Sequence, residues 1–228
     1  MREIVLDTET TGLDPAAGHR LVEIACIELI NGVPSGAMFH RYVNPQRDIP
    51  SEAFAVHKLS LEFLSDKPLF AEIADEFIAF MEDSPLIAHN AEFDCKFVNA
   101  ELVRCYRPKL SCTTIDTVML ARQKFPGAPA SLDALCKRFA IDNSARTVHG
   151  ARLDAELLAV VYMELLGGRQ HGLGLAASVE QAGGSSPLTV AADRDSRARP
   201  PRPHEPTADE LAAHAAFLTK LKNPLWTA

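Results

Sequence analysis

The sequence has 228 residues, of which 47% are hydrophobic, so it can form one domain of ordinary size with a buried core and still carry extensions. Its net charge of −7 argues weakly against a protein that holds nucleic acid by overall charge, but not against an enzyme whose acidic site reaches phosphates through metal ions. It contains no apolar run of about 18 residues that would predict a membrane span. No secretory signal is recognisable, so a cytoplasmic protein is expected.

The first segments predict strands. EIVL at 3–6 is short and apolar, and LVEIACIELI at 21–30 reads as a longer second strand. The pair Asn31-Gly32 is a strong hairpin signal and leads to a third strand over 37–43. Three strands joined by short turns indicate a sheet that begins with antiparallel pairs.

Helices and a further strand follow. A short helix opens at Ser51, and apolar residues at helical spacing predict a longer helix over 69–82. PLIAH at 85–89 is a fourth short strand, and Asn90 is expected to cap a helix over 91–105.

Asp116 and Ser131 each precede another helical segment. Asp116 is expected to be a helix cap rather than a metal ligand, and His89, at the end of the fourth strand, is expected to be structural. The segment 150–166 is the last helix of this body, closed by Gly167 and Gly168.

The composition changes after residue 169. Residues 172–206 are rich in Gly, Ala, Ser, Pro and Arg and offer little to bury, so 170–206 is predicted to be a flexible linker between a folded body, 1–169, and a C-terminal segment, 207–228. That segment opens with Thr207 and Glu210 at capping-box spacing. It carries an apolar stripe and the single tryptophan: Leu211, Ala215, Leu218, Leu221 and Trp226. A terminal tryptophan beyond a long linker favours docking on another protein over packing against its own body.

Three acidic motifs follow predicted elements in a similar way. DTETTG follows the first strand, HNAEFD follows the fourth and enters a helix, and HGARLDAE opens the last helix. Because open α/β sheets collect their chemistry at strand ends and adjoining helix starts, we expect the acids of these motifs to converge. The acids are Asp7, Glu9, Asp94 and Asp154.

Four carboxylates cannot share a small space without counter-charge. Mg²⁺ and Mn²⁺ favour oxygen ligands, and a pair of such ions can stabilise both the attacking and the leaving oxygen of a phosphodiester displacement. Asp7 and Glu9 lie two residues apart on a strand, so both side chains project to one face. His149 precedes the helix that carries Asp154, and a loop imidazole can accept a proton from an attacking water.

These three motifs, in this order and spacing, resemble the DEDDh exonuclease superfamily. The resemblance implies a ribonuclease H-like α/β fold: a mixed five-stranded sheet flanked by helices, followed here by a flexible C-terminal tail. It implies that Asp7, Glu9, Asp94 and Asp154 hold two divalent cations, Mg²⁺ or Mn²⁺, and that His149 is the general base. Glu52 and His57, in EAFAVH, match positions that contact the terminal nucleotide. The implied substrate-binding set is Asp7, Glu9, Glu52, His57 and Asp154.

Residues 1–169 most resemble the proofreading members of this superfamily. The resemblance implies a metal-dependent 3′→5′ DNA exonuclease that releases nucleoside 5′-monophosphates from a single-stranded or frayed 3′ end. It also implies a DNA polymerase catalytic subunit as partner of residues 207–228, and leaves room for a further small core subunit. Two alternatives stay open: an RNA-trimming enzyme of the same superfamily, and a catalytically silent subunit that only stabilises a polymerase.

Overall fold

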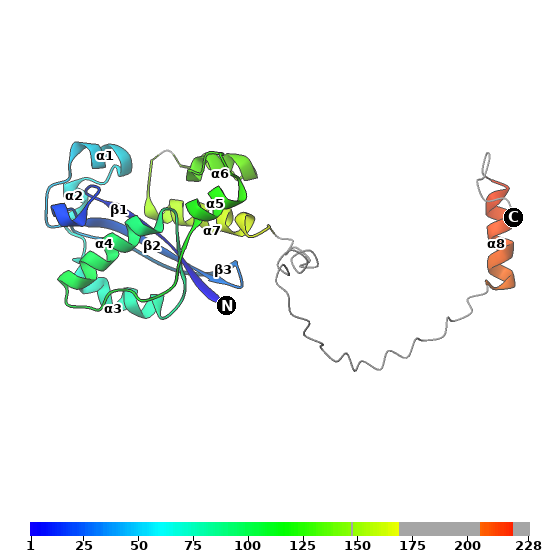
Figure 1. The fold of residues 1–228 in the computed structure, drawn as a ribbon, viewed down its shortest axis with the longest axis horizontal. Helices are drawn as coiled ribbons and strands as arrows, with labels where there is room; N and C mark the ends of the chain where they lie inside the picture. The colour runs from blue at the N-terminus through cyan, green and yellow to red at the C-terminus, as the bar shows by residue number, and fades with distance from the viewer. Residues whose placement is uncertain (147, 169–205, 221–228) are drawn as a thin grey trace, which may run out of the picture. The chain divides into compact units, whose positions relative to one another are not determined.

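The computed structural model describes residues 1–146, 148–168 and 206–220 (Figure 1). The body and the C-terminal helix belong to separate units and are described by themselves. Within these residues, no helix combines the length and the apolar character that crossing a bilayer requires. The predicted linker, together with Leu221 and Trp226 of the C-terminal segment, lies outside the described residues apart from residue 206.

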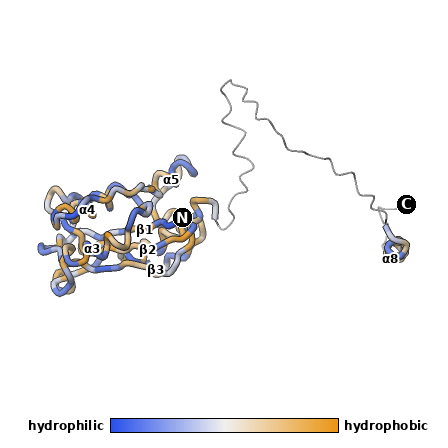
Figure 2. The backbone as a smooth tube through the Cα atoms, turned by 90° about the horizontal axis from the view of Figure 1, so that it is seen from below, coloured by the Kyte–Doolittle hydropathy of each residue, from blue (hydrophilic) through white to orange (hydrophobic). Residues whose placement is uncertain are grey.

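The centre of the body is a five-stranded sheet in the order β3-β2-β1-β4-β5. Its strands are β1 (Arg2–Thr10), β2 (Leu21–Ile30), β3 (Val33–Tyr42), β4 (Leu86–Ala88) and β5 (Thr114–Asp116). The strands β1, β2 and β3 pair antiparallel and lie side by side in Figure 2, whereas β4 and β5 run parallel to β1. The predicted mixed five-stranded sheet flanked by helices is therefore confirmed.

Helices cover both faces of this sheet (Figure 1). They are α1 (Ser51–His57), α2 (Leu61–Leu64), α3 (Phe70–Met81), α4 (Ala91–Arg104), α5 (Thr117–Lys124), α6 (Leu132–Phe139) and α7 (Ala151–Leu165), with a short 3-10 helix, η1 (Pro15–Ala17), after β1. One core cluster joins the sheet to α3 and α4, and the other joins it to α5, α6 and α7.

The alternation of side chains along β1 decides where its acids point. Ile4 and Leu6 belong to the core cluster under α3 and α4, whereas Val5 belongs to the cluster under α7. By the same alternation Asp7 and Glu9 share the face of Val5, as their spacing predicts. The side chain of Thr8 points the other way, toward α4.

Some local predictions were wrong. The first strand does not stop at residue 6 but runs to Thr10, so Asp7 and Glu9 lie within β1, because pairing with β2 continues through both. The short strand β5 was not recognised, since three residues give too little pattern. Asn90 stands at the N-cap of α4 but adopts a left-handed conformation (φ 72°), and its side chain makes no capping hydrogen bond.

Other local predictions are confirmed. Asp116 caps α5 by accepting a hydrogen bond from the Val118 N–H, and His89 is tied to the Thr117 hydroxyl. The C-terminal helix, α8 (Ala208–Leu218), begins with the predicted capping box between Thr207 and Glu210. None of its residues is buried: within the predicted stripe, Leu211 and Ala215 are exposed and Leu218 is half-buried.

Candidate active site

The four acids and His149 line one pocket of about 300 Å³. We call it the acidic pocket; it lies where β1 and the first turns of α4 and α7 meet. Phe93, His89 and Arg146 also line it. The structure therefore brings together all five residues that the three sequence motifs single out.

Asp94 enters the acidic pocket from the first turn of α4. It is 4% exposed, and its Oδ1 accepts a hydrogen bond from the Thr8 hydroxyl at 2.7 Å. Burial raises the pKa of Asp94 to about 7, although the Thr8 hydrogen bond opposes the shift. The threonine after Asp7 thus links the central strand to the helix that supplies the third acid.

Burial and neighbouring negative charges strongly raise the pKa values of the two acids of β1. Burial, followed by repulsion from Glu23 and Asp154, raises the pKa of Glu9 to about 8. The pKa of Asp7 is raised well above its usual value, first by burial and then by the charges of Asp94 and Glu9. These carboxylates ionise together only when positive charge is brought among them.

Asp154 lies in the first turn of α7, and its carboxylate reaches the Glu9 and His149 side chains. One ligand atom from each of these three residues falls within 4.8 Å of the others. His149 lies in the loop before α7, as predicted, and its ring is half exposed with Nδ1 3.4 Å from Asp154 Oδ2. Its backbone N–H donates to the Val56 carbonyl of α1 at 3.3 Å.

Arg146 is a member of this site that the sequence did not indicate. Its guanidinium donates to both carboxylate oxygens of Asp154, at 2.6 and 2.7 Å, and to Asp133 at 2.8 Å. It also lies 2.8 Å from His149 Nδ1. The Arg146 side chain is only 8% exposed, so it is a fixed internal cation among the acids. No periodic pattern marks a loop arginine, and only the folded chain places it here.

Glu23 is a second residue that the sequence analysis missed. It lies opposite Glu9 in the β1–β2 register and is 2% exposed. One carboxylate oxygen accepts from the Ala151 N–H at 3.1 Å, and the other lies 2.7 Å from His40 Nε2. Because Gly150, at the N-cap of α7, has no side chain, Glu23 supplies the cap from the sheet. A lone acid within the apolar run LVEIACI was the signal available for it.

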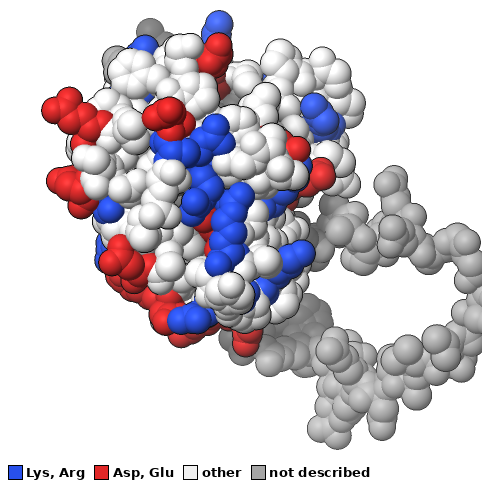
Figure 3. Space-filling view, turned by 90° about the vertical axis from the view of Figure 1, so that its left-hand side faces the viewer, with Lys and Arg blue, Asp and Glu red and all other residues white. Residues whose placement is uncertain are grey.

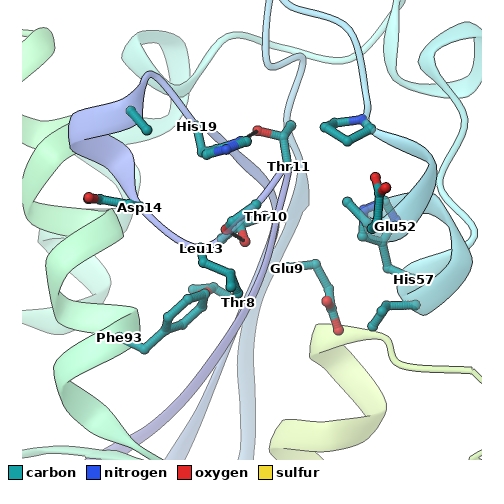
Figure 4. A pocket seen from close by; sticks show the side chains of 15 residues that line it. Thr8, Glu9, Thr10, Thr11, Leu13, Asp14, His19, Glu52, His57 and Phe93 are labelled. Carbon is teal, nitrogen blue, oxygen red and sulfur yellow. Dashed lines mark hydrogen bonds between the residues drawn. The ribbon is translucent and has the colours of Figure 1, made fainter.

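A second pocket of about 550 Å³ adjoins the first and shares Thr8, Glu9 and Phe93 with it. We call it the terminal pocket. Figure 4 shows Glu52 and His57 on α1 facing Leu13 and Phe93 across it. The structure thus places the two residues matched to terminal-nucleotide contacts beside, and not within, the acidic pocket.

His57 lines the terminal pocket and has a ring nitrogen without a hydrogen-bond partner among the described residues. Its Nδ1 accepts from the Leu59 N–H at 3.0 Å, which leaves the proton of the neutral ring on Nε2. Burial lowers the pKa of His57, so the neutral form is favoured. Nε2 is buried and has no partner among the described residues. A buried donor of this kind is rare unless a ligand completes it.

Hydrogen bonds of two threonine hydroxyls hold the end of β1 and the loop that follows it. The Thr10 hydroxyl donates to the Gly12 carbonyl at 2.6 Å, and the Thr11 hydroxyl accepts from the Arg20 N–H at 2.9 Å. A Cβ at Gly12 would stand 2.3–2.6 Å from the His19 ring, so glycine permits this packing. These side chains shape the rim of the terminal pocket.

The acidic pocket fits a divalent cation. Its donors include the carboxylate oxygens of the four acids, and oxygen ligands of this kind suit Mg²⁺ and Mn²⁺. Burial raises the pKa values of Glu9 and Asp94, and repulsion from Glu23 and Asp154 adds to the shift at Glu9; a bound cation would favour the ionised carboxylates. Both oxygens of Asp154 are already bonded to Arg146, so a cation held by Asp154 must share those oxygens or displace the guanidinium.

Comparison with known proteins defines the class. The family model RNase_T, described as an exonuclease, matches residues 4–162. The chain therefore belongs to this exonuclease family, whose members are typically metal-dependent. A structure of exonuclease X in complex with 5′ overhanging duplex DNA is 28% identical, with a TM-score of 0.57 over 72% of this chain and 90% of that one. The nuclease domain of 3′hExo, a DEDDh family member bound to rAMP, shares the fold at 16% identity, with a TM-score of 0.62 over 72% and 91%.

Curated relatives narrow the class. DNA polymerase III subunit epsilon of Rickettsia conorii is 49% identical over 225 residues, which cover 97% of this chain and 96% of the relative. The protein of the same name from Escherichia coli K12 is 42% identical over 226 residues, covering 95% and 92%. The protein is a 3′→5′ exonuclease of the kind to which these subunits belong.

The raised pKa values predict how stability depends on pH. In excess chelator, the free energy of unfolding should fall as pH rises from about 4.5 to about 8, the ordinary and the folded-state pKa of Glu9. An acid with a higher pKa in the folded state binds its proton more tightly there, so its stabilising contribution is present at low pH and lost as pH rises. Thermal unfolding at constant ionic strength measures this. Mn²⁺ should restore stability at pH 8, and Glu9→Gln should make the profile shallower without removing it, because the pKa values of Asp7 and Asp94 are raised as well. A stability that rises over this range would contradict the electrostatic account.

Glu23 should position the catalytic helix. Glu23→Ala should lower kcat by about 10²-fold, the cost of a small misplacement of reacting groups. KM for a short oligonucleotide should stay nearly unchanged, because Glu23 lines neither the acidic nor the terminal pocket. Glu23→Gln keeps an oxygen that can accept from the Ala151 N–H and should retain most activity. Amide exchange at Ala151 should accelerate in the alanine variant only.

Tyr162→Phe is the matched control for Glu23. The Tyr162 hydroxyl donates to Glu3 at 2.9 Å and ties the same helix to β1, but neither residue lines the acidic or the terminal pocket. Its loss should lower the melting temperature without a comparable loss of kcat. If Tyr162→Phe and Glu23→Ala reduce kcat equally, the role of Glu23 is general stability and not positioning.

Proposed function

We propose that this exonuclease proofreads DNA for a replicative polymerase, using two Mg²⁺ or Mn²⁺ ions to release nucleoside 5′-monophosphates from mispaired 3′ ends. The observation that carries the proposal is the convergence of four carboxylates and His149 on one pocket that opens directly onto a second. The second pocket has the volume and the mixed polarity that a nucleotide requires.

In this proposal Asp7, Glu9, Asp94 and Asp154 hold the cations; Asp7, Glu9 and Asp154 also bring the scissile phosphate to them. When bound, the cations supply charge stabilisation for the phosphodiester displacement and a lowered pKa for the attacking water. The protein holds the carboxylate ligands in position before the cations bind. Thr8 fixes Asp94, and the Glu23 cap fixes the turn of α7 that carries Asp154.

His149 is proposed to accept the proton of the attacking water. Water oxygen bonds to phosphorus, the bond from phosphorus to the 3′ oxygen of the shortened strand breaks, and a proton passes to that leaving oxygen. To act as base, the imidazole needs a nitrogen with a free lone pair, and Nδ1 currently faces Arg146 at 2.8 Å. The half-exposed ring has room to turn away from Arg146.

The terminal pocket is proposed to hold the 3′ nucleotide. His57 Nε2–H is an unpartnered donor for a sugar or base oxygen, and Glu52 on the same helix is an acceptor for a hydroxyl or an amino group. The apolar side chains of Leu13 and Phe93 suit the faces of a base. None of these contacts distinguishes the four bases, so selectivity for a mismatch is proposed to come from easier fraying of the end.

The two alternatives are less well supported. The complete set of acids with His149 in one pocket argues against a catalytically silent subunit. Full-length similarity to proteins named DNA polymerase III subunit epsilon argues against an RNA trimmer. Rates on matched DNA and RNA 3′ ends separate the two activities.

The partner of the C-terminal segment is proposed to be the polymerase catalytic subunit. On α8, Leu211 and Phe217 are each more than half exposed, which leaves an apolar surface for a partner groove. Figure 3 shows that basic side chains gather in a band between acidic ones on one face of the body, so the net charge of −7 is unevenly spread. Tethering to the polymerase would keep such a body near DNA without a strongly basic surface.

The first test is metal-dependent hydrolysis of a single-stranded DNA oligonucleotide by the purified chain. Asp7→Ala and Asp154→Ala should each reduce the rate by at least ~10³-fold, because several kcal/mol of charge stabilisation are lost. The wild type in excess chelator should be equally inactive. Near-normal activity in any of these three samples would overturn the assignment.

The same preparation tests His149. The wild-type rate should rise with pH over the range in which imidazole loses its proton, and His149→Ala should flatten that rise. Calorimetric titration with Mn²⁺ should show that metal binding persists in the variant. If the substitution abolishes metal binding instead, His149 is a ligand rather than a base.

The C-terminal segment should act independently of the acidic pocket. The double variant Leu218→Ala/Trp226→Ala should weaken binding to the polymerase catalytic subunit by ~2 kcal/mol or more if both side chains are buried anchors. Hydrolysis of a short single-stranded oligonucleotide should be unchanged. Unaltered binding, or an equal loss of free exonuclease activity, would show that this segment packs elsewhere.

A further inference from the structure

We infer that a third cavity binds the nucleotides on the 5′ side of the scissile bond. This upstream pocket, of about 640 Å³, lies at the start of α4 and beside α5. Its lining includes Asn90, Glu92, Asp116, Met119, Arg122 and Ser131. The inference rests on the proposed function, because it assumes that the terminal pocket receives the 3′ nucleotide.

The three pockets adjoin one another at the carboxyl ends of β1, β4 and β5. The terminal and acidic pockets share Thr8, Glu9 and Phe93. The acidic and upstream pockets share His89 and Ser131. The acidic pocket is therefore the middle compartment, with one pocket adjoining it on each side.

This order fixes the polarity of the strand. The scissile phosphodiester joins the terminal nucleotide to the rest of the chain and must lie at the carboxylates. With the terminal nucleotide on one side, the remaining nucleotides leave on the other side, which is the upstream pocket. A strand running the opposite way would leave the residues of α1 without a terminal nucleotide to contact.

The side chains of the upstream pocket suit a single strand. Arg122 is exposed, and no hydrogen bond or ion pair ties its side chain to another of the described residues. Met119 lies one turn before it on α5 and is 61% exposed. The i,i+3 spacing puts a guanidinium for a phosphate beside an apolar side chain for a base.

Neither acid that lines the upstream pocket, Glu92 or Asp116, forms an ion pair with Arg122. Asp116 already accepts hydrogen bonds from the Val118 and Asn90 N–H groups, at 2.8 and 3.2 Å. Asn90 is exposed, and its left-handed backbone leaves its amide group out of the α4 cap, where it can reach a sugar or base. Arg122 is thus the pocket's basic group for a phosphate.

The first experiment varies substrate length. The substrates are the 4-nitrophenyl ester of thymidine 5′-monophosphate, which contains only the terminal nucleotide, and a ten-nucleotide DNA strand. Arg122→Gln should raise KM for the ten-nucleotide strand about tenfold, as expected for loss of a charge-assisted contact. It should leave kcat/KM for the ester unchanged. The slope of log(kcat/KM) against log[salt] for the long strand should become shallower by about 0.7.

Arg107→Gln is the matched control. Arg107 is an exposed arginine bonded to Asp75 on α3, and it lines none of the three pockets. Arg107→Gln should leave KM for the ten-nucleotide strand and kcat/KM for the ester unchanged. Met119→Ala should also raise KM for the long strand only.

Combining modified substrates with the Arg122→Gln variant identifies the phosphate that Arg122 contacts. Neutral methylphosphonates replace single phosphates at successive positions 5′ of the scissile bond. One of them should raise KM for the wild type but have no further effect in Arg122→Gln. If Arg122→Gln leaves the long-strand KM and salt slope unchanged while the wild type hydrolyses both substrates, the upstream pocket is not on the path. If the wild type hydrolyses neither substrate, it is the proposed function that fails.

Discussion

Four carboxylates that repel one another are packed into the centre of this fold. Asp7, Glu9, Asp94 and Asp154 line one pocket; burial raises the pKa of the first three, and repulsion from the other acids adds to the shift at Asp7 and Glu9. Such a cluster destabilises the folded state, and the packing of the surrounding chain must offset that cost. It also creates a strong preference for positive charge at one point. The feature that costs stability is the feature that recruits divalent cations.

The scaffold holds this cluster from several directions. β1 is buried on both faces, so side-chain alternation sends Asp7 and Glu9 toward α7 and Thr8 toward Asp94 on α4. The sheet fixes α7 in turn, because Glu23 accepts the first N–H of that helix. Arg146 supplies an internal cation that spans Asp154, Asp133 and His149. Asp94 and Asp154 are therefore held by residues outside their own helices, whereas the alternation of β1 places Asp7 and Glu9.

The arrangement of the three pockets explains how an acidic protein can act on a polyanion. Negative charge is concentrated in the middle compartment, where cations are expected to reverse it. The flanking compartments offer different groups: His57 and Phe93 on one side, Arg122 and Met119 on the other. Sequence-independent contacts of this type suit an enzyme that removes any base. Under the proposed tethering by α8, the polymerase and not the surface charge of the body would supply the local concentration of DNA ends.

The α/β class, most elements and the five motif residues that line the acidic pocket could be predicted from the sequence, because each lies in a local pattern. Spacing of two places Asp7 and Glu9 on one face, and the helix starts mark Asp94 and Asp154. Features without a local sequence pattern became visible in the folded chain. The extension of β1 through both acids depends on pairing with β2, and β5 is too short to carry a pattern. Arg146, in a loop, donates hydrogen bonds to Asp154. Glu23 accepts a hydrogen bond from Ala151, which lies 128 positions later in the chain. Contacts between residues so far apart in the chain arise from packing, and packing is a property of the whole fold.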